Sequence, residues 1–415
     1  MKKYYQIQLL LLAVFLSSIP AYAEEFSPHE DELAVNPQLP LKEVLEKTYI
    51  RNPSQAVLQS REATVRARNI MANSMLPGAP AVSMTHQNDT MGSGRGERDW
   101  QAEIELPVWL PNQRLNRQKV ADATTSNLAT SRESLKLQVA GLLRDDLWDI
   151  AMNDSNVELA NQRLDTAKSL QHDVERRYQA GEMAKTDLML AQQETLMAEK
   201  ASLLAEAEQM HARHRYFVLT GLREMPAQYQ EQQSTLLDYY QSPLWLEYES
   251  KVNLAENERD LTAVERRENP QILFNTRTQR GPFDTSYNDS VGLKVRIPLD
   301  SEVRSAPLQA AAEVVVGNAI TERESLRMML DTALHEAEHN LSVTRAELEI
   351  TGQQATIAKE SLRLARKAFQ LGETDLVSLL RVQAQTYEAE KAYTTRQIQL
   401  QWDIARYNQA VGVLP

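Results

Sequence analysis

The chain contains no cysteine among its 415 residues. This absence excludes disulfide bonds, thiolate metal sites and a lipidated N-terminal cysteine. Aromatic residues make up only 6% of the chain and glycine occurs 13 times. Alanine, leucine, glutamate, glutamine and arginine dominate instead, which is typical of long helices and coiled coils. Noncovalent packing must therefore hold the fold together.

Proline is missing from two long stretches, 112–225 and 308–414, so neither contains a strong helix breaker. Each stretch is interrupted by a glycine instead, Gly181 in the first and Gly372 in the second. Residues that can cap a returning helix follow each glycine: Thr186, Asp187, Thr374, Asp375 and Ser378. The pattern predicts two antiparallel helical hairpins with these glycines at their tips. The first arm, from about 112 to 180, would be about 100 Å long.

The first 23 residues have the pattern of a secretory signal peptide. Lys2 and Lys3 precede an apolar run at 7–16, and Ala-Tyr-Ala at 21–23 supplies a cleavage site. The run has about half of the roughly 20 residues that a membrane-spanning helix needs. We therefore expect export and a mature chain that begins at Glu24.

Acidic residues outnumber basic ones, and the formal net charge is -12. Removal of Lys2 and Lys3 with the signal peptide would make it -14. Such a charge argues against nucleic acid and against an anionic membrane surface as partners.

The chain matches itself when it is shifted by 191 positions. The matched pairs are Trp100 with Val291, Ile104 with Val295, Leu106 with Ile297, Pro107 with Pro298, Gly181 with Gly372, and Gly221 with Gly412. Earlier pairs need a shift of 190, namely Pro53 with Pro243 and Pro80 with Pro270. This register indicates one duplicated unit of strands and long helices. The predicted parts are an extended arm at 24–40, a first repeat at 41–222, a polar linker at 223–242 and a second repeat at 243–415. Each repeat is expected to begin with a helix that leads to its first strand, from Leu41 to about Leu76 and from Leu244 to about Arg267.

The hydrophobic period changes from helical to two in both repeats, before the long helices. The predicted strands cover about 80–90, 98–107, 270–280 and 289–298. The clearest apolar faces consist of Trp100, Ala102, Ile104, Leu106, Val291, Leu293, Val295 and Ile297. About ten residues suffice for a tilted strand to cross a bilayer. A half-buried hairpin in a soluble protein would show the same alternation.

Four strands are too few to close a barrel, because about eight is the smallest number. If the strands span a membrane, several copies of the chain must share one barrel. The alternating pattern then directs Glu103, Glu105, Lys294 and Arg296 toward the lumen. A basic residue facing lipid near the midplane would cost about 2–4 kcal/mol. Their mixed signs favour pairing across the barrel wall.

The duplicated arrangement resembles the outer-membrane efflux protein family, the TolC-like channel-tunnels, over essentially the whole mature chain. The best local matches are the two tips, at 178–188 and 369–380, and the strand-to-helix junction at 106–111. The resemblance implies a homotrimer in the outer membrane of a Gram-negative bacterium. Twelve strands would form one β-barrel, and twelve helices would continue it as a long α-helical barrel in the periplasm.

The resemblance also implies a function, the outer-membrane channel of a tripartite efflux system. Such a channel is a passive exit duct without catalysis or cofactor, supplied by an inner-membrane pump through a periplasmic adaptor. The adaptor would dock on the tips at Ala180, Gly181, Glu182, Met183, Leu371, Gly372, Glu373 and Thr374. The same residues would end a helix in any helical hairpin. The acidic gate positions of the family fall on Ser378 and Arg381, so Glu373 and Asp375 are the nearest carboxylates for a gate.

The segment at 106–114 looks like those of cobalt, zinc and cadmium efflux relatives, which favours heavy-metal cations as cargo. Drug efflux or type I secretion would use the same scaffold. A different class of protein, a soluble periplasmic coiled-coil structural or adaptor protein, would also account for the long helices.

One motif points to chemistry. The segment from His335 to His339 satisfies the H-E-x-x-H pattern of zinc peptidases, with Glu336 as the base. However, no sharp turn interrupts its helix from about 308 to 371, and no third ligand is evident. The repeat mates of the two histidines, Arg144 and Trp148, carry no such pair. We therefore predict no enzyme and no metal site, and interpret this pair, like His211 and His214, as helix surface.

Overall fold

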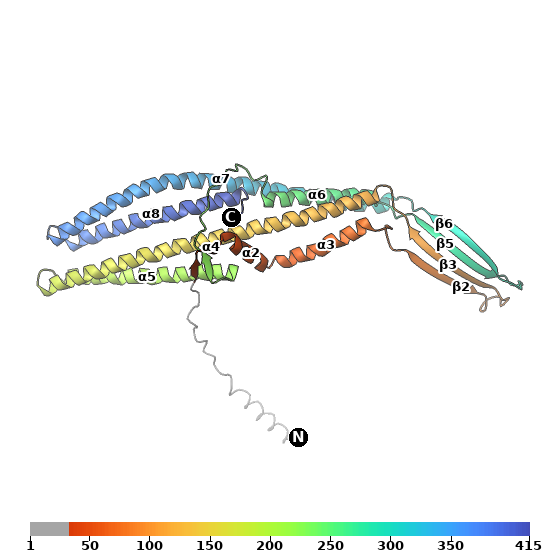
Figure 1. The fold of residues 1–415 in the computed structure, drawn as a ribbon, viewed down its shortest axis with the longest axis horizontal. Helices are drawn as coiled ribbons and strands as arrows, with labels where there is room; N and C mark the ends of the chain where they lie inside the picture. The colour runs from red at the N-terminus through yellow and green to blue at the C-terminus, as the bar shows by residue number, and fades with distance from the viewer. Residues whose placement is uncertain (1–32) are drawn as a thin grey trace, which may run out of the picture.

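The structure, a computed structural model, describes residues 33–415. The predicted signal peptide and residues 24–32 of the predicted arm lie outside the described residues. The long helices run side by side, and the β-sheet stands at one end of them (Figure 1). The molecule is therefore a rod of mixed α and β structure, which confirms the predicted mixed class. No helix in the described part combines the length and apolar character needed to cross a membrane.

Four antiparallel strands form the sheet, in the order β2-β3-β5-β6. Their bounds are β2 Ala81–Asn88, β3 Arg98–Pro107, β5 Gln271–Arg280 and β6 Asn288–Arg296. Each β-hairpin contributes two neighbouring strands, and the β3–β5 pair joins the two hairpins. Within residues 33–415, β2 and β6 pair on one side only, so both edges of the sheet are open.

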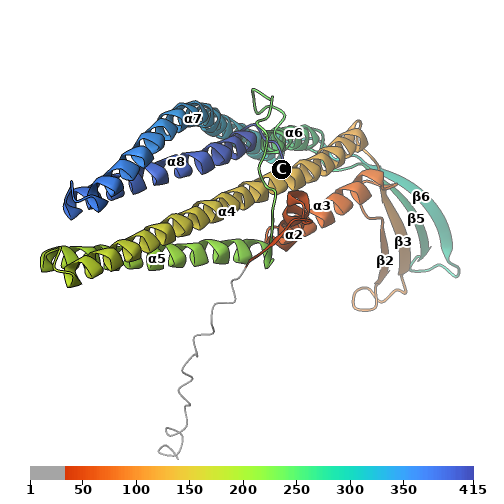
Figure 2. The ribbon, with the colours of Figure 1, turned by 60° about the vertical axis from the view of Figure 1, so that its left-hand side comes forward.

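Two antiparallel helical hairpins make up most of the rod. They consist of α4 Gln113–Gln179 with α5 Lys185–Thr220, and α7 Glu302–Gln370 with α8 Leu376–Ala410. With 67 residues, α4 is about 100 Å long. Contacts join α7 to α8, α8 to α4, and α4 to α5, so the four helices form a row (Figures 1 and 2).

The region predicted as one helix from Leu41 to about Leu76 consists of two helices, α2 Leu41–Arg51 and α3 Gln55–Asn73. Pro53 explains the break, because a residue that precedes proline is disfavoured in the helical conformation. Asn52 accordingly has an extended backbone, with φ -60° and ψ 130°. The corresponding helix before the second sheet hairpin is α6, Pro243–Val264, which is continuous.

The predicted arm and the predicted linker are tied to each other. Strand β1, Ala34–Asn36, pairs in parallel with strand β4, Glu224–Pro226. The linker also reaches the helices, since Tyr239 is 2% exposed and its hydroxyl bonds to Asp331 of α7. The polar composition of 223–242 therefore belongs to a segment that packs on the rod.

The main core lies where α2, α4 and α5 meet, near the middle of the rod (Figure 2). Its fully buried members include Val44, Val139, Ala140 and Tyr216. The buried hydroxyl of Tyr216 donates to the Glu224 carbonyl at 3.0 Å. This bond satisfies the polar end of the ring and anchors β4 to the helices.

Candidate functional site

The register of the sheet places apolar side chains of all four strands in one row. Val82, Ile104, Phe274 and Leu293 are directly paired neighbours across β2, β3, β5 and β6. Directly paired residues share one face of a sheet. All four are exposed, with exposed fractions of 77%, 48%, 51% and 66%. The sheet thus presents a continuous apolar face that nothing in residues 33–415 covers, and such faces mark contact with a partner or a membrane.

The four residues predicted for the lumen lie together on the opposite face. Glu103 pairs with Ser83 and Asn275, and Glu105 pairs with Ala81 and Leu273. Leu273 in turn pairs with Lys294, and Arg296 follows two residues later on the same face. Whether this face lines a lumen stays a prediction, but the sorting of charge to one side of the sheet is a property of the register.

Pairing among these four residues does not occur within the chain. Glu105 and Lys294 are separated by strand β5, which puts their backbones about 9–10 Å apart. The ion pair on this face joins Asp99 to Arg277 instead, with guanidinium nitrogens 2.7–3.0 Å from the carboxylate oxygens. The sequence pattern gave no signal for this pair, because its two members lie 178 positions apart.

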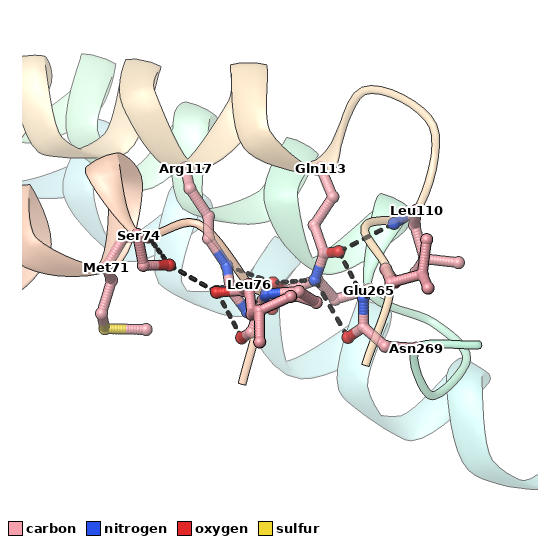
Figure 3. Close-up of polar contacts among 10 residues, drawn as sticks. Met71, Ser74, Leu76, Leu110, Gln113, Arg117, Glu265 and Asn269 are labelled. Atoms are coloured by element: carbon pink, nitrogen blue, oxygen red, sulfur yellow. Dashed lines mark hydrogen bonds and ion pairs between the residues drawn. The ribbon is translucent and has the colours of Figure 1, made fainter. Parts of the chain in front are cut away.

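A network of polar side chains fixes the junction between sheet and helices, in the segment where α4 begins (Figure 3). Gln113 is 1% exposed, and its amide accepts from the Leu110 N–H at 3.0 Å and donates to Glu265 at 2.8 Å. Arg117 reaches the same Glu265 oxygen at 2.8 Å, and Asn269 donates to Gln113 at 2.6 Å. These bonds connect the start of α4 to the end of α6, so they hold the sheet at a defined angle to the rod.

The two hairpin tips close with the same hydrogen bonds. In the first, Gly181 N–H donates to the Tyr178 carbonyl at 3.0 Å and Glu182 N–H to the Arg177 carbonyl at 2.9 Å. In the second, the equivalent donors are Gly372, at 3.1 Å, and Glu373, at 2.9 Å. The glycines have φ of +80° and +77°, in the left-handed region that ends helices. Both tips are therefore Schellman-type turns.

The eight predicted docking residues are not equally accessible. Ala180, Gly181, Glu182, Leu371, Gly372 and Glu373 are exposed, whereas Met183 and Thr374 are half-buried. The Met183 side chain packs on a cluster shared by both hairpins, whose buried members are Val174, Ala191, Phe369, Leu376 and Leu379. The two tips of one chain are therefore packed together, and six residues remain available to a partner.

The two residues predicted as a gate differ in their surroundings. Glu373 is exposed at the tip. Asp375 is the N-cap of α8, and its carboxylate accepts the Ser378 N–H at 2.8 Å. Hydrogen bonds from Ser378 hold the pKa of Asp375 below its ordinary value of 3.8. In the first hairpin this role moves to Asp187, which accepts the Ala184 N–H at 3.3 Å from inside the helix.

The histidine pair of the H-E-x-x-H motif is exposed on α7. The ring centroids of His335 and His339 are 6.5 Å apart, and the rings are nearly parallel, at 7°. Within residues 33–415 no group of three histidine, aspartate or glutamate side chains is arranged to hold a metal ion. The described part of one chain thus supplies a pair of imidazoles on one face of a continuous helix, without a third ligand beside them.

The fold is that of outer-membrane channels. No protein-family model and no curated protein sequence matches the chain. Among solved structures, the outer membrane protein VceC of Vibrio cholerae is similar with a TM-score of 0.73 and 14% identity, over 90% of this chain and 96% of VceC.

Two further channel structures agree. The Campylobacter jejuni CmeC outer membrane channel gives a TM-score of 0.69 at 12% identity, over 89% of this chain and 85% of that one. The Neisseria gonorrhoeae MtrE outer membrane channel, in its open state, gives 0.70 at 14% identity, over 92% and 91%. At such identities the likeness concerns the fold, and it extends over nearly the whole of each chain.

Proposed function

We propose that the chain is the outer-membrane channel of a tripartite efflux system. The observation that carries this proposal is the uncovered apolar face of a sheet with two open edges, at one end of a rod about 100 Å long. Open edges favour pairing with further strands. An apolar outer face suits lipid, and the charged face suits water. The channel folds of VceC, CmeC and MtrE support the same conclusion.

The proposal includes a homotrimer in the outer membrane of a Gram-negative bacterium. Edge strand β6 of one copy pairs with β2 of the next, and twelve strands close the barrel. The proposed duplication of the chain supports this arrangement, because the next copy then continues the order of strands already present. The helical hairpins continue the barrel into the periplasm. An adaptor docks on the six exposed tip residues, and a pump in the inner membrane supplies the energy.

The channel itself is a passive duct rather than an enzyme. Its side chains shape and line the path, while the adaptor favours the open arrangement of the tips. Because Phe369 and Val174 belong to one buried cluster, the two hairpins of one chain are joined at the tip. Opening then separates neighbouring copies or rotates the joined pair.

Fractionation tests the channel against the soluble coiled-coil alternative. The full chain, expressed in a Gram-negative host, should remain in the outer membrane after salt washing and osmotic shock. It should require detergent for extraction and have the mass of a trimer. Release as a soluble monomer would contradict the proposal.

We propose heavy-metal cations as the cargo, on the basis of the 106–114 segment. A deletion strain should then lose growth in zinc, cobalt, cadmium or copper and keep its growth in common antibiotics, and the wild-type gene should restore it. Sensitivity to antibiotics alone would instead favour the drug-efflux alternative, and a secretion defect would favour type I secretion.

A further inference from the structure

The contact between α4 and α8 within one chain gives a template for the contact between two copies. The Asp145 carboxylate of α4 accepts from the Trp402 indole N–H at 2.8 Å and lies 3.8 Å from the Arg406 guanidinium. Arg144 donates to Gln409 at 2.6 Å. These residues join the first helical hairpin to the second.

Repeating the same step between copies would join α7 of one copy to α5 of the next. Among the four described helices of the row α7, α8, α4, α5, the outer two each contact only one other member, α7 with α8 and α5 with α4 (Figures 1 and 2). A shift of 191 residues carries α4 onto α7 and α5 onto α8. Within one chain, the first helical hairpin contacts the second through α4 and α8. If neighbouring copies in the proposed trimer contact each other in the same way, α7 of one copy takes the place of α4, and α5 of the next copy takes the place of α8.

Residues at equivalent positions support the shift of 191 between α5 and α8. Arg215 corresponds to Arg406, and Tyr216 corresponds to Tyr407. Both tyrosines are buried, with exposed fractions of 0% and 3%, and each hydroxyl donates to a backbone carbonyl, of Glu224 and of Leu236. Gly221 and Gly412, five residues after these tyrosines, both adopt left-handed backbone with φ of +71° and +86°.

The repeated contact keeps its chemistry. Glu336 takes the place of Asp145, so a carboxylate is retained. His211 takes the place of Trp402, so a ring N–H donor is retained beside that carboxylate. Arg215 takes the place of Arg406, and within its own chain it is paired with Asp149.

Three more histidines fall at the same contact. His214 corresponds to Ala405 of α8, which is 0% exposed. His335 and His339 correspond to Arg144 and Trp148, which are 3% and 4% exposed. All of these histidines are exposed in the single chain. On α5, histidine is larger than the alanine that it replaces. On α7, the two histidines are smaller than the arginine and tryptophan that they replace, so the changes in volume compensate each other.

We propose that this junction is a binding site for a divalent transition-metal cation, formed only between two copies of the chain. The inference rests on the proposed trimer. His335, His339 and Glu336 come from α7 of one copy, and His211 and His214 come from α5 of the other. Imidazole with carboxylate is a ligand set that suits zinc, nickel and copper. The Glu208 carboxylate, 3.8 Å from the His211 ring nitrogen, adds a further oxygen.

The proposal explains why residues 33–415 of one chain hold no three-ligand site. The i, i+4 spacing puts His335 and His339 on one helix face, where they supply two ligands. The remaining ligands come from a helix that does not touch this face in the single chain. A metal ion at each of the three junctions would hold neighbouring copies together, because it binds the assembled form only.

Zinc binding to the detergent-extracted trimer tests the site. After chelation and dialysis, the trimer should take up about one zinc ion per chain, measured by elemental analysis and titration calorimetry. The His211→Ala variant and the His335→Ala/His339→Ala double variant should each weaken zinc binding by at least about tenfold. The matched control is His172→Ala, an exposed histidine on α4 away from the junction, which should leave zinc binding unchanged.

The absence of cysteine permits an independent test of the junction. The Glu336→Cys/His211→Cys double variant should give cross-linked dimers and trimers in the outer membrane when a short bis-maleimide bridges the two thiols, because the template contact joins side-chain tips rather than Cβ atoms. The matched control is Asp145→Cys/Trp402→Cys, at the template contact, which should cross-link within the chain and give no such ladder. A ladder together with the zinc results supports the site.

The outcomes separate this inference from the proposed function. A trimer that binds no zinc, or whose zinc binding survives His211→Ala, overturns the shared site and leaves the channel intact. Recovery of the protein as a soluble monomer overturns both.

Discussion

At the residue scale, a buried ion pair between Arg144 and Glu231 ties the linker to the rod. Two guanidinium nitrogens of Arg144 each lie 2.7 Å from a different Glu231 oxygen. Arg144 also donates to the Val413 carbonyl at 2.9 Å. The two side chains are only 4% and 10% exposed. Burial makes this pair sensitive to the loss of one partner, because the remaining charge is left without compensation.

We predict that Arg144→Leu lowers the free energy of unfolding by about 3–5 kcal/mol. Guanidinium denaturation followed by far-ultraviolet circular dichroism measures the change. The Arg144→Leu/Glu231→Leu double variant should recover most of the loss, because no unpaired charge remains. As a surface control, Arg363→Leu removes the exposed pair with Glu360 and should cost at most about 1 kcal/mol. Equal losses for both single variants would contradict this prediction.

A second residue-scale feature is the carboxyl of Asp146 on α4. Burial raises its pKa from the ordinary value of 3.8 to about 6, against the opposing effect of Arg215 and with help from Asp149 and Asp145. Between these two pH values the folded chain binds more protons than the unfolded chain. The contribution of Asp146 to the free energy of unfolding therefore falls as the pH rises through this window.

Replacing Asp146 by Asn should consequently stabilise the protein at about pH 7.5, by about 1 kcal/mol once solvent screening of this half-buried group is discounted. The gain over wild type should shrink as the pH falls from 6 and approach zero near pH 3, below both pKa values, where the carboxyl is largely protonated in both states. Denaturation midpoints of the two proteins, compared at each pH, measure this. A gain that stays constant across the range would count against the raised pKa.

At the element scale, neighbouring residues of one strand face opposite sides of the sheet. On β2, Met84 is 75% exposed on the apolar face, paired with Ala102, whereas Ser83 pairs with Glu103 on the charged face. This difference makes the two positions a matched pair for a test of which face meets lipid.

In the proposed barrel, Met84→Arg should reduce membrane insertion by about 2–4 kcal/mol, because the charge then faces lipid. Ser83→Arg should insert almost as wild type, because its charge meets water and the Glu103 carboxylate. The readout is the yield of heat-modifiable trimer in the outer membrane. If Ser83→Arg were the more damaging change, the assignment of faces would be reversed.

At the scale of the whole molecule, the exposed tips stand at the opposite end of the rod from the sheet (Figure 1). Their backbone is fixed by two Schellman-type turns, and the residues proposed for adaptor docking include the exposed carboxylates of Glu182 and Glu373. A partner bound there would meet a rigid, acidic surface.

We predict that Glu182→Lys/Glu373→Lys weakens adaptor binding about tenfold, which corresponds to about 1.4 kcal/mol. Trimer assembly should be unchanged, because both side chains are exposed at the tips. Pull-down of the adaptor measures the loss of binding, and growth of the host in the presence of the transported toxin measures the loss of efflux. Glu199→Lys, an exposed charge reversal higher on α5, is the control and should behave as wild type. Normal efflux by the tip variant would place the docking surface elsewhere.

Local features of the fold could be predicted where one short segment contains the whole signal. Gly181 and Gly372 predict the two tips, because the residue after a helix often takes the left-handed conformation and glycine adopts it without strain. The alternation from Trp100 to Leu106 predicted a strand with two unlike faces, and the register bears this out. The Pro53 break was missed although its signal was present, because the helical period continues on both sides of it.

The sequence by itself determined the long helices, the strand faces and the tips, since hydrophobic period and helix-ending residues act over a few neighbouring positions. Only the tertiary structure decided which distant side chains meet, such as Asp99 with Arg277, Arg144 with Glu231 and Gln113 with Glu265. Their members lie 178, 87 and 152 positions apart, and polar residues of this kind occur throughout the chain. Local patterns carry no information about which of them become partners, because the packing of whole helices and strands sets those distances.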